Sequence, residues 1–185
     1  MSEPGAAPEP SDEALMERYV VGGERAAFEA LFRRYAPRLH GFFLRQAGAR
    51  EVANDLVQQT FLHVHRARAD FALGRSVRPW IYTIALNVRR EHQRRRHRKP
   101  EVSHDPVAHG VPSVAPSTSS RTDRLVQRAL QQLNPQQREV ILLHYYEDLS
   151  FPEIAELVGA SLSAVKVRAH RGYERLRELL GEPRA

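Results

Sequence analysis

The 185-residue chain has no cysteine, no long apolar run and hardly any sign of β-strands. Without cysteine it has neither a disulfide nor a thiolate metal site, which favours a reducing compartment. No stretch approaches the ~20 apolar residues of a membrane-spanning helix. The acidic, proline-rich start "MSEPGAAPEPSDEA" lacks the basic and apolar parts of a secretory signal. We therefore expect a cytoplasmic protein without membrane insertion.

The chain does contain recurring helical periodicity. Apolar residues repeat at helical spacing from about Glu13 to Leu180, and no Asn-Gly or Asp-Gly hairpin signal interrupts them. Residues 100–121 carry four prolines and five serines without apolar periodicity, which is typical of a flexible linker. The predicted fold is all-α, with two small helical domains. The expected divisions are a disordered tail (1–11), a first domain (12–99), the linker (100–121) and a second, helix-turn-helix domain (122–182).

The linker by itself does not decide how the two domains are arranged. A coil of 22 residues has an extended reach of ~75 Å, so the domains could lie together or far apart. Positive charge is concentrated in the first domain: residues 1–99 hold 18 basic and 11 acidic residues, whereas residues 122–185 hold nine of each. The net charge of +6 makes a polyanionic partner plausible.

The stretch at residues 77–99 begins as an apolar helix and ends with seven Arg and Lys residues against one Glu. So many like charges favour a phosphate backbone as partner, although a solvated helix end would explain them about equally well. The periodicity predicts a buried face made of Val77, Trp80, Ile81, Ile84, Ala85 and Val88. The opposite face is expected to carry Tyr82, Leu86, Arg89, Arg90 and Gln93.

Two other features of the first domain affect its helices. Pro37 is expected to kink or split the helix that follows Gly22-Gly23. In the next helix, either Phe61 or Leu62 is expected to face inward.

The second domain shows clear helix starts. Asn134 before Pro135, and Ser150 followed three residues later by Glu153, are both capping patterns. Together they predict helices at about 121–133, 135–147, 151–158 and 162–180. The short connection "GAS" with Gly159 is typical of a helix-turn-helix, in which Ala155 lies at the helix crossing and Val165 packs back on the first helix.

The last helix is predicted to have a cationic outer face. Five basic residues and one acid lie between Lys166 and Arg177, and Ser163, Val167 and Arg171 lie opposite its apolar side. Arg suits guanine edges or phosphates, Ser suits adaptable hydrogen bonds, and Val and Ala suit thymine methyl groups. We therefore favour DNA binding over a helical hairpin that makes no DNA contacts.

Three stretches resemble the bacterial extracytoplasmic-function (ECF) sigma factors of RNA polymerase. "NDLVQQTFLHVHRA" is similar to the core-binding motif of that family, and "RPWIYTIALNVRREHQRR" to its W-L-x-x-I-A-x-N segment. Residues 133–179 are similar to the C-terminal DNA-binding region. The three stretches stand in the family's order, with a linker in between.

The resemblance implies a transcription initiation factor that binds core RNA polymerase, reads the -35 and -10 promoter elements and assists promoter melting. Core polymerase would be contacted at the β′ clamp helices and, by residues 125–147, at the β flap. An anti-sigma factor is a common further partner in the family. The residues implied for polymerase binding are Asp55, Gln58, Gln59 and Phe61. Those implied for the -10 element are Asp70, Phe71, Arg75, Arg78, Trp80, Asn87, Arg90 and Arg94. Those implied for the -35 element are Ser161, Ser163, Ala164, Lys166, Val167, Arg168, His170 and Arg171.

Two alternatives belong to other functional classes. A stand-alone helix-turn-helix regulator would not need the polymerase-docking stretch around Asp55. A metal-dependent enzyme would have to use the nine histidines, but His63 and His65 diverge on a helix and no nucleophile–base pair or phosphate-binding glycine loop is evident. We therefore expect no enzymatic activity, no catalytic residue, no metal and no cofactor.

Overall fold

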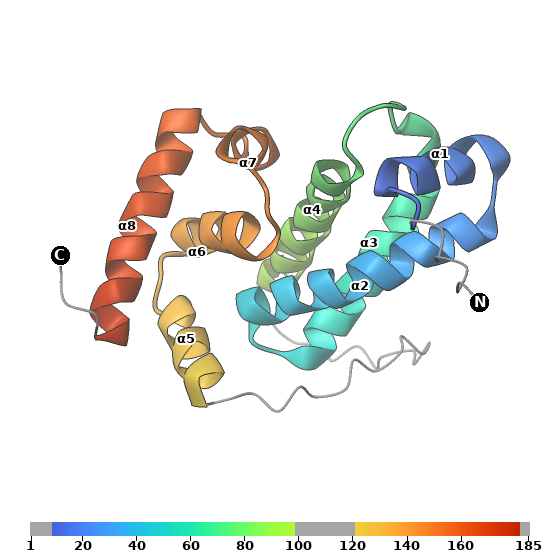
Figure 1. Ribbon diagram of the computed structural model, residues 1–185. Helices are drawn as coiled ribbons and strands as arrows, with labels where there is room; N and C mark the ends of the chain where they lie inside the picture. The colour runs from blue at the N-terminus through green and yellow to red at the C-terminus, as the bar shows by residue number, and fades with distance from the viewer. Residues whose placement is uncertain (1–8, 99–120, 182–185) are drawn as a thin grey trace, which may run out of the picture.

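The computed structural model describes residues 9–98 and 121–181, and all regular structure in these residues is helical. The expected linker, apart from Arg121, and residues 1–8 of the expected tail lie outside the described residues. The elements are α1 (Asp12–Gly22), α2 (Arg25–Ala47), α3 (Arg50–Arg66), η1 (Arg68–Asp70), α4 (Val77–Arg98), α5 (Arg121–Gln131), α6 (Pro135–Ile141), η2 (Leu142–Tyr146), α7 (Phe151–Val158) and α8 (Leu162–Leu180). We call α1–α4 the N-terminal module and α5–α8 the C-terminal module (Figure 1).

The N-terminal module is a bundle in which α2 and α3 pack along each other and α4 packs on α3. Its start is fixed by side chains of the expected tail. Ser11 caps α1 by accepting a hydrogen bond from the Ala14 amide at 3.1 Å, and Glu9 pairs with Arg34 at 3.0 Å. Glu9 and Ser11 therefore contact the helical bundle, although residues 9–11 are exposed and precede the first helix.

Pro37 does not split its helix, because α2 continues from Arg25 to Ala47. An internal proline removes one hydrogen bond and costs about 3 kcal/mol. The burial of one whole face of α2, which includes Leu31, Leu39 and Phe42, stabilises the helix and offsets that cost. Because this face is packed, α2 remains helical on both sides of Pro37.

The C-terminal module begins its helices where the capping patterns predict. Ser150 and Glu153 form the complete capping box, and Asn134 accepts a hydrogen bond from the Gln136 amide at 3.0 Å. Gly159 ends α7 with φ of +65°, a conformation that glycine adopts without strain. The predicted boundaries of α7 and α8 are confirmed.

The predicted helix 135–147 is regular only as far as Ile141, and a wider π-helical turn, η2, follows. Four consecutive residues, 140–143, are buried. One face of a regular α-helix cannot bury four consecutive residues, but this segment is covered on two sides: α6 packs on α8, and η2 packs on α2 of the other module. α8 crosses α6 closely at Gly172, where a Cβ atom would lie 2.5 Å from Cδ1 of Ile141.

The two modules pack against each other and share one continuous core. α7 lies against α4, and α5 and η2 lie against the end of α2 (Figure 1). Tyr82 and Leu86, which were predicted on the face opposite the buried one, are fully buried. The prediction for these two residues is wrong because the C-terminal module provides a second packing surface for α4.

Within residues 9–98 and 121–181, no helix combines the length and the apolar character needed to cross a membrane.

Candidate nucleic-acid interface

The outer face of α8 is the first candidate surface. α7 and α8 are joined through Gly159 in a helix-turn-helix, and Val165 is buried between them as predicted. Ser163, Lys166, Val167 and Arg171 are exposed, and Arg168 is partly exposed. Among the described side chains, no carboxylate lies within 4 Å of the Lys and Arg residues in this group. Their charges are therefore available for phosphates or base edges.

Two other residues predicted at this surface make side-chain contacts within the protein. The Ser161 hydroxyl caps α8 by accepting a hydrogen bond from the Ala164 amide at 3.2 Å, and it lies 3.1 Å from the Ser163 hydroxyl. His170 lies 3.6 Å from Glu174 on the exposed surface. The partly exposed Ala164 follows the cap, at the end of α8 that a helix-turn-helix presents to DNA.

The second candidate surface joins the loop before α4 with α4 itself. Asp70, Arg75, Asn87 and Arg94 are exposed and Arg90 is partly exposed. Phe71 is buried, and its ring meets Trp80 edge to face with centroids 5.1 Å apart. The aromatic pair therefore fixes the loop onto the start of α4, and Phe71 offers little surface to a ligand.

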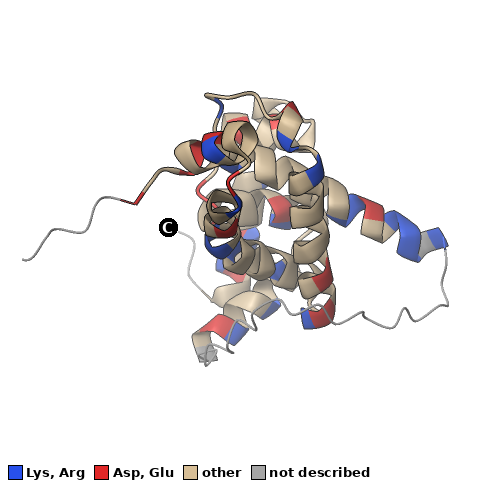
Figure 2. Cartoon of the chain, turned by 90° about the vertical axis from the view of Figure 1, so that its right-hand side faces the viewer, with Lys and Arg blue, Asp and Glu red and all other residues tan. Residues whose placement is uncertain are grey.

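The basic end of α4 extends beyond the helical bundle (Figure 2). Residues 93–96 and Arg98 are exposed. One acid, Glu91, lies just before these residues and accepts a hydrogen bond from Arg95 one turn on. That bond and the arginine's charge hold the pKa of Glu91 below its ordinary value. A projecting helix end whose exposed arginines outnumber its acids is suited to follow a phosphate backbone.

The predicted polymerase-binding residues on α3 divide into two groups. Asp55 is exposed and accepts a 2.7 Å hydrogen bond from Gln59, and Gln58 is partly exposed on the same side. Phe61 is buried and packs on Phe32, with ring centroids 4.6 Å apart. Its side chain therefore supports α3 from inside the bundle. The exposed face continues instead through Leu62, one residue along, which the spacing alone could not distinguish from Phe61.

A third cluster, which we call the module contact, was not predicted. It brings Arg38, Arg78, Tyr82 and Arg89 of the N-terminal module against carboxylates of the C-terminal module. Those acids are Glu139, Glu147 and Asp148. Burial raises the pKa of the Glu147 carboxyl above its ordinary value, although hydrogen bonds from Tyr82 and Arg38 act in the opposite direction. Burial also raises the pKa of the Tyr82 hydroxyl, with the charge of Glu147 adding to it.

Among the described residues, no three His, Asp or Glu side chains come close enough together to hold a metal ion.

Two family models match the chain in the order of its modules. The model for Sigma-70 region 2 matches residues 31–99, and the model for Sigma-70 region 4 matches residues 123–176. The chain is 43% identical to the RNA polymerase sigma factor CarQ of Myxococcus xanthus over 90% of its own length and 96% of the relative's. It is 30% identical to the ECF RNA polymerase sigma factor SigM of Mycobacterium tuberculosis, over 96% of its own length and 88% of the relative's.

A solved structure resembles the whole arrangement. The sigma factor RpoE from Bartonella quintana, crystallised in complex with the anti-sigma factor NepR, superposes with a TM-score of 0.69 at 27% identity. The superposition covers 85% of this chain and 98% of that chain.

Proposed function

The chain belongs to the extracytoplasmic-function (ECF) sigma factors of RNA polymerase, and we propose a separate role in transcription initiation for each of its two modules. A sigma factor is a non-enzymatic initiation factor that binds core RNA polymerase and directs it to promoter DNA. We assign region 2 to residues 12–99 and region 4 to residues 122–182. The observation that carries the proposal is that each module presents its own exposed cationic surface, one on α8 and one along α4.

The C-terminal module reads the -35 element as double-stranded DNA in this proposal. The start of α8 enters the major groove, where Ser163, Ala164 and Val167 face base edges. Lys166, Arg168 and Arg171 bind guanine edges or phosphates, which suits side chains that have no carboxylate partner in the described part of the chain. Ser161 and His170 flank this surface.

The N-terminal module binds the -10 element and helps to open it. Melting costs stacking energy, which a protein offsets by capturing an extruded base and holding the displaced strand. The loop with the exposed Asp70 and Arg75, to which the Phe71–Trp80 pair gives support, would capture the base. Asn87, Arg90 and Arg94 continue along α4 toward the basic end and would hold the strand.

Core polymerase docks on α3 in the same proposal. Asp55, Gln58 and Gln59 contact the β′ clamp helices, and the segment 125–147 contacts the β flap. The exposed Leu62 adds apolar surface to the α3 site. Because the solved RpoE structure contains an anti-sigma factor, we include such a protein among the partners of this chain. The factor would work in the cytoplasm, where bacterial polymerase transcribes.

Run-off transcription with purified core polymerase tests the function directly. Core polymerase lacking any sigma factor is incubated with a genomic fragment library, with and without the protein. We expect discrete start sites only when the protein is present. DNA binding by the protein without polymerase association or start-site selection would instead indicate a stand-alone helix-turn-helix regulator.

Replacing Asp55 by alanine is expected to weaken association with core polymerase about tenfold or more, because a charge-assisted hydrogen bond contributes roughly 1.5–3 kcal/mol. The fold should not change, since Asp55 is exposed and its bond to Gln59 lies at the surface. The dissociation constant is measured by fluorescence anisotropy of labelled protein with core polymerase. Glu17→Ala, which removes an exposed acid on α1, is the matched control. Equal affinities for the two variants would show that Asp55 is not at the docking surface.

A further inference from the structure

The start of α4 cannot be capped in the way that the other helices of this chain are. Three helices, α1, α7 and α8, follow a serine whose hydroxyl accepts a hydrogen bond from the amide of the third helical residue. Those serines are Ser11, Ser150 and Ser161. Ser76 stands at the same place before α4, but the third residue of α4 is Pro79, which has no N–H group. The serine cap therefore lacks its donor.

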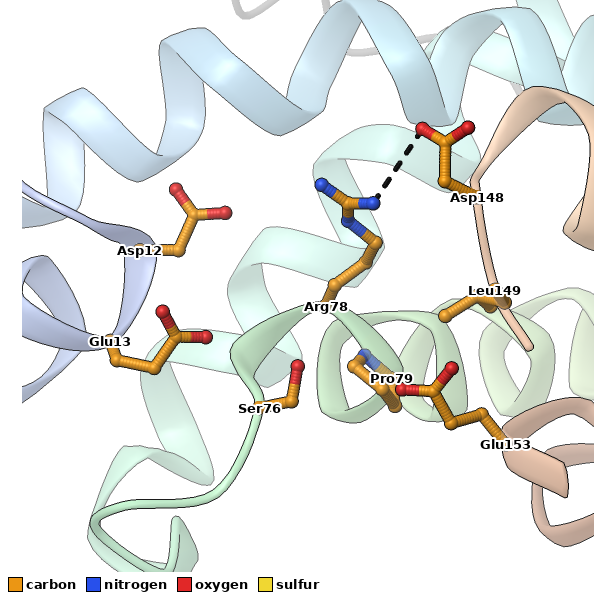
Figure 3. A pocket seen from close by; sticks show the side chains of 8 residues that line it. All are labelled: Asp12, Glu13, Ser76, Arg78, Pro79, Asp148, Leu149 and Glu153. Carbon is orange, nitrogen blue, oxygen red and sulfur yellow. Dashed lines mark ion pairs between the residues drawn. The ribbon is translucent and has the colours of Figure 1, made fainter.

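A carboxylate from another helix binds the start of α4 instead. The Val77 amide, at the first position of α4, donates a hydrogen bond of 3.2 Å to Oε1 of Glu13 in α1. In Figure 3 the Glu13 side chain extends from α1 toward Ser76 and the start of α4. Its negative charge suits the positive end of the helix dipole, and the first turn of α4 contains no acid of its own. Glu13 thus supplies from α1 what the sequence of α4 lacks.

α1 holds Glu13 at a fixed place relative to α2. The neighbouring Asp12 pairs with Arg34 of α2 at 2.7 Å and accepts a hydrogen bond from the Tyr35 hydroxyl. Further along α1, the Met16 side chain is fully buried in the core. Because α1 is fixed in this way, a side chain that extends from it can determine where α4 begins.

The same contact fixes one end of the loop assigned to the -10 element. At the start of this loop, the buried Phe71 ring packs against Trp80. At its end, Glu13 binds the first amide of α4. Residues 72–76 between these two points are exposed, and Arg75 is one of them. A displacement of the first turn of α4 would therefore move Arg75 and the rest of the loop.

We propose that Glu13 is a positioning residue for recognition of the -10 element, because its cap on α4 fixes the loop that captures the base. This inference rests on the proposed function, since it requires that loop to bind an extruded base. Glu13 acts on the loop and makes no contact with DNA. A preorganised loop favours the base that fits it, whereas a loose loop adapts to several bases and discriminates less between them.

The surroundings of Glu13 permit informative substitutions. Its exposed side chain lines an open cavity of about 180 Å³, together with Asp12, Ser76 and Arg78 (Figure 3). Glutamine at position 13 therefore fits without a clash and keeps an acceptor oxygen, although it loses the charge. Alanine removes both the acceptor and the charge.

Holoenzyme assembled from core polymerase and each variant tests the proposal. A promoter chosen by run-off transcription with the wild type competes in one reaction with a copy in which one -10 base is replaced. The ratio of the two transcripts measures base discrimination, and each -10 position is tested in turn. We expect Glu13→Ala to lower the ratio about fivefold at the position that the loop reads, and Glu13→Gln to lower it about twofold. Glu17→Ala, which removes an exposed acid from the same helix, should keep the wild-type ratio.

A compensating change tests the capping explanation itself. Pro79→Ala gives the third residue of α4 an N–H group, which Ser76 can then bind as Ser161 binds the Ala164 amide. Added to Glu13→Ala, it should restore discrimination to within about twofold of that of Pro79→Ala alone. A further Ser76→Ala change should remove this rescue. Neither a lost charge nor a generally weakened module would respond in this way.

Unchanged discrimination in Glu13→Ala, a loss equal to that of Glu17→Ala, or the absence of rescue by Pro79→Ala would each overturn the proposal. If Glu13→Ala does not fold, Glu13→Gln against Glu17→Gln decides in the same way. These outcomes concern the variants alone and leave run-off transcription by the wild type unaffected. Failure of the wild type in run-off transcription would instead overturn the proposed function.

Discussion

Replacing Arg168 and Arg171 together by alanine is expected to weaken binding to double-stranded promoter DNA about a hundredfold. Each arginine contact to a base edge or phosphate contributes roughly 1–3 kcal/mol, and neither side chain pairs with a carboxylate among residues 9–98 and 121–181. The salt dependence should also fall. Each phosphate contact contributes ~0.9 to the slope of log K against log salt, so the loss of two lowers it by up to ~2.

The measurement is a titration of a promoter fragment, chosen by run-off transcription, at several salt concentrations. Arg175→Ala with Arg177→Ala is the matched control, because it removes the same charge from the same helix further from the end that enters the groove. We expect the control to change affinity less than threefold, since Arg175 pairs with Glu178 at the surface. If both double variants behave alike, α8 contributes only general positive charge and the groove assignment is wrong.

Replacing Phe42 by alanine is expected to lower the free energy of unfolding of the N-terminal module by about 3–5 kcal/mol. Phe42 is fully buried, and its ring meets Phe43 and the edge of Tyr82, with centroids 5.5 and 5.7 Å away. Removing the ring leaves a cavity that the surrounding helices only partly fill. Because Tyr82 also holds Glu147, the same cavity should loosen the module contact.

Unfolding in urea is followed by the fluorescence of Trp80, the only tryptophan, which lies in α4 and therefore reports on this module. Phe42→Leu is the control, because it keeps most of the apolar volume and should cost less than half as much. A loss below 1 kcal/mol for the alanine variant would mean that α2 and α4 do not depend on this contact.

Local signals in the sequence decided where most helices begin and end. A capping box at Ser150, a glycine after α7 and an asparagine before Pro135 satisfy backbone groups within a few residues, so their effect can be predicted without the rest of the chain. Helical spacing likewise predicted the outward face of α8 at Ser163, Val167 and Arg171.

Predictions failed or stayed open where a helix can pack against more than one surface of the protein. Spacing left Phe61 and Leu62 equivalent, and only the packing of Phe28 and Phe32 on α3 selects Phe61 for the interior. The regular helix expected beyond Ile141 gives way to the wider turn of η2, in a segment that is covered from two sides. Pro37 was expected to kink or split its helix, and the split does not occur because burial of one face of α2 outweighs the cost of the proline.

By itself the sequence determined the helical class of the fold, the limits of most of the helices and the cationic face of α8, because each of these depends on groups that lie within a few turns of one another. Only the tertiary structure decided that Tyr82 and Leu86 are buried and that Arg38 meets Asp148, 110 residues further along the chain. The face of α4 that carries Tyr82 and Leu86 also carries charged residues, which is the pattern of a solvent-exposed face. No local signal in the sequence identifies a packing partner on the other module. The face is buried because the C-terminal module packs on it, and that module becomes its neighbour only when the chain is folded.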